Sequence, residues 1–512
     1  MNRKIRVFMA IFYLLITFLP VMAKETFTSD IKTFIEGTPY KHATWGILVT
    51  DVKTGETLYE VNPDRMFRSA STAKLFTMAA ALDTFDGDYR FKTPVFKQGE
   101  VNASGELEGN LILVATGDLT MGGRLSPDGH ITFTDMDHTV AGADGSLEAI
   151  LTEEDPLRGL NELAAQVGAS GIKKVKGDVI IDDRLFIHNG FNPVMINDNV
   201  IDFLIKPGEK GKMASVEWRP KNSFFQIDSY VKTVPPGTEP ELTIKSLKKG
   251  HILLSGTVPE GYKPVVRVYQ VEDPSSFCRS LLIDALIRAG ISVDASPVRD
   301  NPSEKLPHRN AYGKLKQVAL LTSPPYSETV KLILKVSHNM GADITPLLIA
   351  AVNGKGTMEE GMSLIHDFLE YNYVDMNGIS LSDGSGGHEA DFVTPRTAVQ
   401  LLRYMYSRPD FKVYHDGLPI LGVDGTIAHS VNENSPARGK VFAKTGTLSA
   451  VDLLNKRGLL TCKALAGYMT TLKGREVAFA IYVNNVPLTS NEDIVKTGND
   501  LGYLCEIIYL NN

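Results

Sequence analysis

Phe67-Arg68-Ser69-Ala70-Ser71-Thr72-Ala73-Lys74-Leu75 places a serine three residues before a lysine, at the start of an apolar run that continues to Leu82. Residues three apart share one face of a helix, so the Oγ of Ser71 and the Nζ of Lys74 are expected to meet where a buried helix begins. A nucleophile beside a base, at a helix end that favours negative charge, suits covalent catalysis. The alternative is an N-cap serine followed by an ordinary surface lysine.

The pattern Ser-x-x-Lys is not selective by itself, because it occurs five times in the chain. Only the pair at Ser71 heads an apolar run long enough to bury a helix. The other four pairs begin in polar, turn-like or strand-like sequence, at Ser29, Ser170, Ser229 and Ser246. Context therefore selects Ser71 and Lys74, but two residues do not establish an activity.

Length and composition limit the classes of protein to consider. A chain of 512 residues is expected to form two or three domains. Its formal net charge of −7 argues against a nucleic-acid-binding protein. The absence of a His-Glu-x-x-His pattern and of any close Cys/His cluster argues against a zinc enzyme. The three cysteines, Cys278, Cys462 and Cys505, are predicted to be buried free thiols, although one disulfide is possible.

The N-terminus has the pattern of a secretory signal peptide. Basic residues precede an apolar run from Val7 to Ala23, and Val21-Met22-Ala23 offers small residues before a cut. We therefore predict cleavage near Ala23 and export to the periplasm or the outer face of the cell. An uncleaved anchor is the alternative, but the run is slightly short for a membrane span.

The order of predicted elements indicates an α/β fold of the α+β kind, with one domain made from both ends of the chain. Strands are expected at 45–50 and 57–61, a helix from Ser71, and a buried hairpin at 464–470 and 477–484 before a final helix over 494–510. Between about 91 and 298, short strands alternate with turns rich in Gly and Asp. This middle region reads as one or two inserted β-rich domains.

Two later stretches offer the other groups that a serine nucleophile needs. Ser337-His338-Asn339 ends an apolar helical run, and Lys444-Thr445-Gly446-Thr447 lies in a predicted edge strand, where Gly446 would let a ligand approach the backbone. The alternatives are a helix C-terminal cap for Ser337 and Asn339, and a solvated edge lysine for Lys444.

The ordered set Ser-x-x-Lys, Ser-x-Asn and Lys-Thr-Gly resembles that of the serine β-lactamases and penicillin-binding proteins. The chain is most similar to the low-molecular-mass class C penicillin-binding proteins, the D-alanyl-D-alanine carboxypeptidase/endopeptidase family. Further stretches that resemble this family are 117–120, 177–182, 383–386, 418–420, 422–426 and 443–448. Two positions depart from it: His338 stands where relatives often have aspartate, and Leu119 replaces a common proline.

The resemblance implies an antiparallel sheet flanked by helices, with two domains inserted in the 263 positions between Lys74 and Ser337 (337 − 74). The expected division is a signal peptide at 1–23, a catalytic domain from 24–92 and 312–512, a second domain from 93–190 and 265–311, and a third at 191–264.

The resemblance also implies roles for the site residues. Lys74, made less basic by burial and by Lys444, would take the proton of Ser71. Ser337 would relay a proton to the leaving amine, and the backbone N–H groups of Ser71 and Thr447 would bind the oxyanion. Asn339 would bind the substrate peptide, while Lys444 and Thr445 hold its terminal carboxylate beside Gly446. No metal or other cofactor is expected.

The implied substrates are peptidoglycan peptides that end in D-Ala-D-Ala or contain D-Ala crosslinks, with β-lactams as covalent inhibitors. We also consider whether Asp182 or Asp183 reads a substrate amine, against the alternative of a turn aspartate. A β-lactamase is the nearest alternative function, although one class's Glu-x-x-Leu-Asn pattern is absent. A non-catalytic cell-wall-binding protein of the same fold is the other, and the three intact motifs argue against it.

Overall fold

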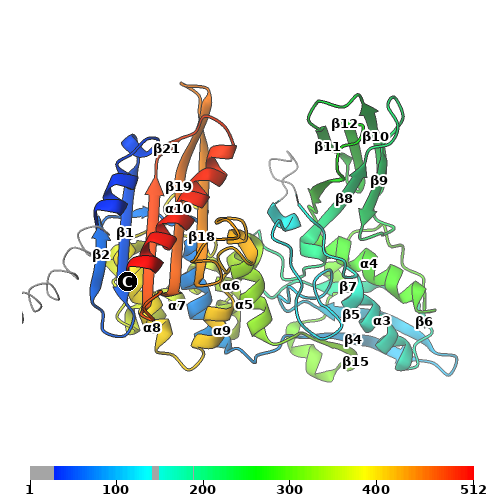
Figure 1. The fold of residues 1–512 in the computed structure, drawn as a ribbon. Coiled ribbons are helices and arrows are strands. Elements are labelled where there is room, and N and C mark those ends of the chain that lie inside the picture. The colour runs from blue at the N-terminus through cyan, green and yellow to red at the C-terminus, as the bar shows by residue number, and fades with distance from the viewer. Residues whose placement is uncertain (1–27, 141–148, 188–189) are drawn as a thin grey trace, which may run out of the picture. The chain divides into compact units, whose positions relative to one another are not determined.

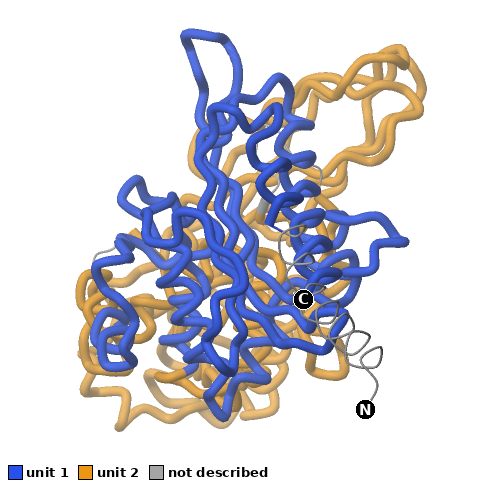
Figure 2. Tube along the Cα trace, turned by 60° about the vertical axis from the view of Figure 1, so that its left-hand side comes forward, with its two compact units in different colours: residues 1–82, 365–512 blue, residues 83–364 orange. Residues whose placement is uncertain are grey.

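The computed structural model describes residues 28–140, 149–187 and 190–512. The predicted signal peptide and its cleavage point near Ala23 lie outside these residues. The chain forms two compact units (Figure 2): unit 1 combines residues 1–82 with 365–512, and unit 2 comprises residues 83–364. Each unit is described by itself.

Unit 1 is built on an antiparallel sheet that joins the two ends of the chain (Figure 1). Its strand order is β18-β19-β20-β1-β2, so β18 lies at an edge. The strands are β1 (Thr44–Asp51), β2 (Thr57–Val61), β18 (Val441–Asp452), β19 (Arg457–Thr470) and β20 (Glu476–Asn484), and β21 (Val486–Pro487) pairs with β19. The predicted strand pair at the N-terminus and the hairpin at the C-terminus are both present.

Helices α8 (Pro395–Tyr406) and α10 (Glu492–Asn511) pack against this sheet. Successive side chains of a strand point to opposite faces. On β19, Met469 packs in one core with residues of α10, while the hydroxyl of the adjacent Tyr468 donates to the Leu402 carbonyl of α8 at 2.7 Å. The two helices therefore cover opposite faces of the sheet, which explains why β19 and β20 are almost continuously buried.

Shorter elements complete unit 1. A three-stranded sheet has the order β16-β17-β3 and includes the strand just before Ser71. These elements are η1 (Tyr40–His42), β3 (Phe67–Arg68), η2 (Ala70–Thr72), α2 (Ala73–Phe85), α7 (Met358–Tyr371), η7 (Met376–Gly378), β16 (Ile379–Ser380), β17 (Phe392–Val393), α9 (Phe411–Asp416) and η8 (Gly425–Ile427). Both α2 and α7 extend across the boundary between the units.

Unit 2 contains three sheets. The largest has the order β14-β6-β5-β4-β15 with β7 also paired to β5, and the others are β13-β8-β9 and β10-β12-β11. The strands are β4 (Lys92–Val101), β5 (Glu106–Val114), β6 (Lys174–Val175), β7 (Val179–Asp182), β8 (Val200–Lys206), β9 (Ser215–Arg219), β10 (Gln226–Val234), β11 (Glu241–Lys248), β12 (His251–Pro259), β13 (Val265–Gln270), β14 (Ser292–Val293) and β15 (Lys316–Thr322).

The helices of unit 2 are of two kinds. Helices α3 (Arg158–Ala169) and α4 (Pro274–Arg288) pack together beside the large sheet and share its apolar core. Helices α5 (Tyr326–Lys335) and α6 (Asn339–Val352) follow β15 and are joined by Val336, Ser337 and His338. Short 3₁₀ or turn segments are η3 (His138–Val140), η4 (Asn197–Asn199), η5 (Ser303–Lys305) and η6 (Arg309–Lys314).

These features confirm the predicted fold class, a mixture of helices and antiparallel sheets with a β-rich region inserted between two terminal parts. Cys278, Cys462 and Cys505 are free and buried, as predicted. The chain passes from unit 1 to unit 2 after Leu82 and returns to unit 1 at Ile365. The predicted domain boundaries at 92/93, 190/191, 264/265 and 311/312 stay predictions.

Candidate active site

Ser71 and Lys74 form the centre of the candidate site in unit 1. Ser71 lies in the 3₁₀ turn η2, which leads directly into α2, so the serine precedes the α-helix by two residues and is not part of it. The Nζ of Lys74 donates to the Oγ of Ser71 at 3.0 Å, and Lys74 has no exposed surface. The expected contact is therefore present, and the alternative of an ordinary surface lysine is wrong.

The turn 383–386 closes over the start of α2. The backbone carbonyl of Ser385 accepts a second hydrogen bond from Lys74 Nζ at 3.0 Å, and the carbonyl of Gly384 accepts from the Thr77 hydroxyl at 2.7 Å. Gly386 has φ +88°, and a Cβ there would lie 1.9 Å from the carbonyl oxygen of Ala70. Only glycine combines this conformation with so close an approach. The turn thus orients the lysine amine toward Ser71.

The backbone before the serine is strained. Ala70 has φ +43°, in the left-handed region that residues with a Cβ rarely adopt. The hydroxyl of Thr72 donates to the Ser69 carbonyl at 2.6 Å and lies 3.2 Å from the hydroxyl of Tyr482 on β20. Such strain persists only where surrounding contacts enforce it, and it is common at functional sites.

Strand β18 brings the Lys-Thr-Gly stretch to the same turn. A Cβ on Gly446 would lie 2.9 Å from the Ser69 carbonyl oxygen and 3.0 Å from the Cβ of Ala70. Gly446 therefore makes room for the turn that carries Ser71. The sequence had suggested that the glycine makes room for a ligand. The close approach places the edge strand directly beside the nucleophile turn.

Lys444 is fully buried on β18, which excludes the alternative of a solvated edge lysine. Burial, together with the nearby charges of Lys74 and Lys463, holds the pKa of Lys444 well below its usual value. Its Nζ donates to the carbonyl of Thr445 at 3.0 Å. A buried lysine carries its charge at low cost only beside a negatively charged group.

The next residues of β18 have side-chain partners of their own. The hydroxyls of Thr445 and Thr426 lie 2.8 Å apart. The Nζ of Lys463, on β19 opposite Thr447, donates to the Thr447 hydroxyl at 2.9 Å. Burial lowers the pKa of Lys463 to about 8. Polar groups and cations thus continue along this edge of the sheet.

Ser337 and Asn339 belong to unit 2, where they lie between α5 and α6. Ser337 has φ +62°, and the N–H of His338 donates to the Ile333 carbonyl at 3.2 Å, as in a Schellman motif at a helix C-terminus. His338 is the N-cap of α6, and Asn339 is the first residue of that helix. The alternative of a helix cap therefore describes the backbone at Ser337, and it does not exclude a role for its hydroxyl.

Asp182 and Asp183 differ in their surroundings within unit 2. Asp182 is buried and accepts hydrogen bonds from Arg184 at 2.6 and 2.8 Å and from the hydroxyl of Tyr312. Asp183 accepts from the hydroxyl of Ser275 and lines a cavity of about 620 Å³. The carboxylate of Asp182 is thus engaged by its own neighbours, and recognition of a substrate amine by either residue stays a prediction.

No role was predicted from the sequence for three contributors to the site, although Ser385 and Thr426 lie in stretches that resemble the family. Ser385 acts through a backbone carbonyl, which any residue supplies, so no side-chain pattern reveals it. Thr426, in η8, contacts Thr445, and Lys463, on the neighbouring strand β19, contacts Thr447. Lys463 lies opposite Thr447 in the pairing of β18 with β19, and the predicted edge strand was not paired with the predicted hairpin from the sequence.

Two kinds of feature are absent from residues 28–140, 149–187 and 190–512. Within these ranges no helix is long and apolar enough to cross a membrane. The same residues contain no group of three or more His, Cys, Asp or Glu side chains arranged to hold a metal ion.

The family model and the two relatives described next are all D-Ala-D-Ala carboxypeptidases. A model of the family described as D-Ala-D-Ala carboxypeptidase 3 (S13) matches residues 28–501. A D-alanyl-D-alanine carboxypeptidase from Actinomadura sp. (strain R39) is 27% identical over 487 residues, which cover 89% of this chain and 80% of that protein. The D-alanyl-D-alanine carboxypeptidase DacB of Haemophilus influenzae is 25% identical, over 86% of this chain and 85% of its own length.

Solved structures agree on the fold. Penicillin binding protein 4 (dacB) from Haemophilus influenzae superposes with a TM-score of 0.70 at 20% identity, covering 94% of this chain and 99% of that one. A second structure of the same protein, complexed with a β-lactam, gives a TM-score of 0.68 at 21% identity.

Proposed function

The chain belongs to the D-Ala-D-Ala carboxypeptidase 3 (S13) family, and on that premise we propose that it removes the terminal D-alanine of peptidoglycan stem peptides through an acyl-enzyme on Ser71. The observation that carries the proposal is the hydrogen bond of 3.0 Å between Ser71 Oγ and the buried amine of Lys74, at a strained turn beside β18. A nucleophilic serine needs an adjacent base of this kind.

In the proposed reaction, Ser71 Oγ attacks the carbonyl of the penultimate D-alanine and Lys74 takes its proton. The N–H groups of Ser71 and Thr447 stabilise the oxyanion. The amide bond to the last D-alanine breaks, and Ser337 passes the proton to the leaving amine. Water then hydrolyses the ester and regenerates Ser71. No step of this scheme requires a cofactor.

Substrate recognition is assigned to the remaining motif residues. The terminal carboxylate pairs with Lys444 and the hydroxyl of Thr445, at the part of β18 where Gly446 lies against the Ser71 turn. The burial and lowered pKa of Lys444 support this role, because a bound carboxylate would offset the cost of a buried ammonium group. Asn339 is proposed to hydrogen-bond the peptide backbone of the substrate.

We further propose that the enzyme cuts D-Ala crosslinks, and that β-lactams acylate Ser71 and release it slowly. Crosslink cleavage uses the same attack, with the amine of a second stem peptide as the leaving group. The relative from Haemophilus influenzae that has been solved in complex with a β-lactam supports the inhibition. A β-lactamase would instead turn over the β-lactam rapidly, and this is the alternative that the experiment must separate.

The test is incubation with purified monomeric pentapeptide and crosslinked peptidoglycan fragments, with the products read by mass spectrometry. Loss of one D-alanine from monomers, and conversion of dimers to monomers, are the expected results. The Ser71→Ala protein, folded as judged by circular dichroism, should do neither. Intact substrates after incubation with the folded wild-type protein would overturn the proposal.

Export is proposed from the N-terminal pattern alone. The mature chain is expected outside the cytoplasmic membrane, in the periplasm or at the cell-wall face, and to begin just after Ala23. N-terminal sequencing of the protein from the periplasmic fraction is the direct check. Recovery of the full-length chain in the cytoplasmic fraction would contradict export.

A further inference from the structure

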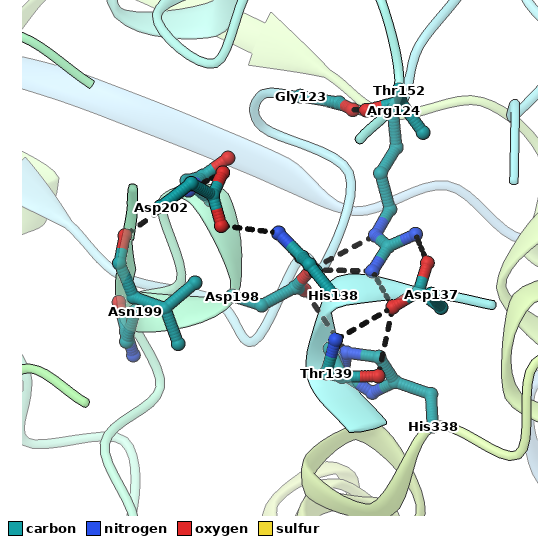
Figure 3. A network of polar contacts seen from close by, with 12 residues as sticks. Gly123, Arg124, Asp137, His138, Thr139, Thr152, Asp198, Asn199, Asp202 and His338 are labelled. Atoms are coloured by element: carbon teal, nitrogen blue, oxygen red, sulfur yellow. Dashed lines mark hydrogen bonds and ion pairs between the residues drawn. The ribbon is translucent and has the colours of Figure 1, made fainter. Parts of the chain in front are cut away.

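A buried cluster of charged side chains in unit 2 lies directly against the Ser-x-Asn stretch (Figure 3). It contains Arg124, Asp137, His138, Asp198, Asp202 and His338, all at most 6% exposed. The connection to the motif is His338, its middle residue. The side chain of His338 is expected to point away from the reacting atoms, but its contacts determine the backbone conformation of Ser337 and Asn339.

His338 is held on three sides. Its N–H donates to the Ile333 carbonyl at the end of α5, and its Nδ1 accepts from the N–H of Gly341 at 2.8 Å in the first turn of α6. Because Nδ1 is an acceptor, the ring proton is on Nε2. That Nε2–H donates to the Oδ1 of Asp198 at 3.0 Å. The contacts therefore require the neutral Nε2–H form of this imidazole.

Asp198 is itself fixed in position. Its Oδ2 accepts from Arg124 Nη2 at 2.6 Å and from His138 Nε2 at 2.7 Å. It lies in the run Asn197-Asp198-Asn199, whose φ angles of +53°, +52° and +54° are all left-handed. Three such residues in succession are costly, so the segment is determined by its contacts. Asn197 and Asn199 supply them with side-chain hydrogen bonds to the carbonyls of Val200 and Val194.

The charges balance without His338 once Arg219, which pairs with the cluster from β9, is counted. Arg124 pairs with Asp137 and Asp198, while Arg219 and His138 pair with Asp202. Burial alone would lower the pKa of His138, but its hydrogen bonds to Asp198 and Asp202 raise it to about 10, so it is a cation at neutral pH. Three basic side chains therefore face three acidic ones around Asp198 and Asp202.

We propose that Asp198 is a positioning residue, which acts through the Nε2–H of His338 to hold Ser337 and Asn339 in their reactive geometry. Ser337 occupies a left-handed conformation (φ +62°) that a serine does not adopt without support. A hydrogen bond from the next residue to a rigid, charged acceptor provides that support. This inference rests on the proposed function, which assigns a proton relay to Ser337 and substrate binding to Asn339.

Two substitutions at His338 separate the contact with Asp198 from the cap of α6. In His338→Asn, the amide oxygen occupies the place of Nδ1 and still caps Gly341, but nothing reaches Asp198. In His338→Gln, the longer amide places a donor near the position of Nε2 and loses the cap. We expect kcat for D-alanine release to fall about 10- to 100-fold in His338→Asn, because small displacements of reacting groups have effects of this size. His338→Gln is expected to retain more of kcat than His338→Asn.

If His338 only caps α6, the order of kcat is reversed: His338→Asn stays near wild type and His338→Gln is impaired. A kcat for His338→Asn within about threefold of wild type would overturn the proposal, as would the reverse order. His251→Asn is the matched control, because it removes another Nε2-to-aspartate contact of 2.7 Å in unit 2 and should leave kcat unchanged. Circular dichroism and the unfolding midpoint establish that each variant is folded.

Asp198→Asn completes a double-mutant cycle with His338→Asn. Loss of kcat in the cycle should be strongly non-additive if the two residues act as one connection. This variant also disturbs the pairing of Arg124 and His138, so if it fails to fold, the two His338 variants decide the matter alone. Failure of the wild-type protein to release D-alanine would instead count against the proposed function, and the two failures are distinguishable.

Discussion

The candidate site depends on two lysines that have been removed from water. Lys74 and Lys444 are both fully buried. The Nζ of Lys74 donates to the hydroxyl of Ser71 and the carbonyl of Ser385, and the Nζ of Lys444 donates to the carbonyl of Thr445. Burial holds the pKa of Lys444 well below its usual value, and a bound anion would favour the charged form of this side chain. We propose that this anion is the terminal carboxylate of the substrate. Lys444 should then determine how well the enzyme binds and cleaves peptides with a free C-terminus.

Lys444→Met tests this at the level of a single side chain. The substitution keeps the apolar stem and removes the charge, so the unfolding midpoint should stay the same or rise. The value of kcat/KM for a D-Ala-D-Ala peptide should fall about 100-fold, since loss of a buried charged partner costs about 2–5 kcal/mol. Steady-state kinetics of D-alanine release measure it.

The exposed Lys440, just before β18, provides the control, and Lys440→Met should leave kcat/KM unchanged. A C-terminally amidated peptide sharpens the experiment. Wild type should discriminate against the amide, and Lys444→Met should lose that discrimination. Equal preference for the acid in both proteins would show that another group binds the carboxylate.

At the level of elements, the site is formed where the edge strand β18 meets the turn η2. Gly446 permits the contact, because a Cβ at this position would lie 2.9 Å from the Ser69 carbonyl oxygen, closer than the strand and the turn can accommodate without moving. The turn 383–386 approaches from the other side and binds Lys74 through the Ser385 carbonyl. Three segments distant in sequence therefore determine where the nucleophile points.

Gly446→Ala is expected to separate the strand from the turn. A Cβ at 2.9 Å from a backbone oxygen requires movement, and overpacking of this kind costs about 1–3 kcal/mol. We expect a lower unfolding midpoint and at least a tenfold slower acylation by a fluorescent penicillin. Gly313→Ala is the control, since a Cβ there meets nothing within 4 Å. Unchanged acylation in Gly446→Ala would show that the strand and the turn do not depend on each other.

The sequence predicted the elements better than it predicted their contacts. The apolar run after Ser71, the two apolar runs of the C-terminal hairpin and the extended stretch around Lys444 each carry a local signal, and all three have the predicted structure. The carbonyl of Ser385 and the left-handed backbone of Ala70 carry none. Asp198 could not be linked to His338, because the two are 140 positions apart and the intervening chain shows no pattern that would join them.

At the level of the whole molecule, each unit has its own apolar core. The core of unit 1 contains residues from both terminal parts of the chain, packed against its sheet. The core of unit 2 lies between its sheets and the helices α3 and α4. Unit 2 also contains the balanced charge cluster, whose stability depends on pH. Asp137 and Asp198 have pKa values held low mainly by Arg124 against the effect of burial, and the pKa of His138 is raised to about 10.

His138→Gln should therefore destabilise the protein in a pH-dependent manner. A histidine whose pKa is raised on folding contributes stability that is complete below its unfolded pKa of about 6.5 and is lost as pH rises through about 10. The difference in unfolding midpoint between wild type and His138→Gln should be largest near pH 6 and shrink toward pH 10. Thermal unfolding at a series of pH values measures it.

Comparing the two proteins at each pH cancels the titration of groups outside the cluster. The His251→Asn protein again serves as control, because the histidine that it replaces is only partly buried. A difference in midpoint that is constant from pH 6 to pH 10 would contradict a charged His138 in the folded protein.

The central claim is that Ser71 is the nucleophile, and identification of the acylated residue tests it most directly. The protein is incubated with penicillin, its intact mass is measured, and the modified peptide is sequenced by tandem mass spectrometry. We predict one penicilloyl group per chain, attached to Ser71 and absent from Ser71→Ala. An adduct on another residue, or one that persists in Ser71→Ala, would contradict the account.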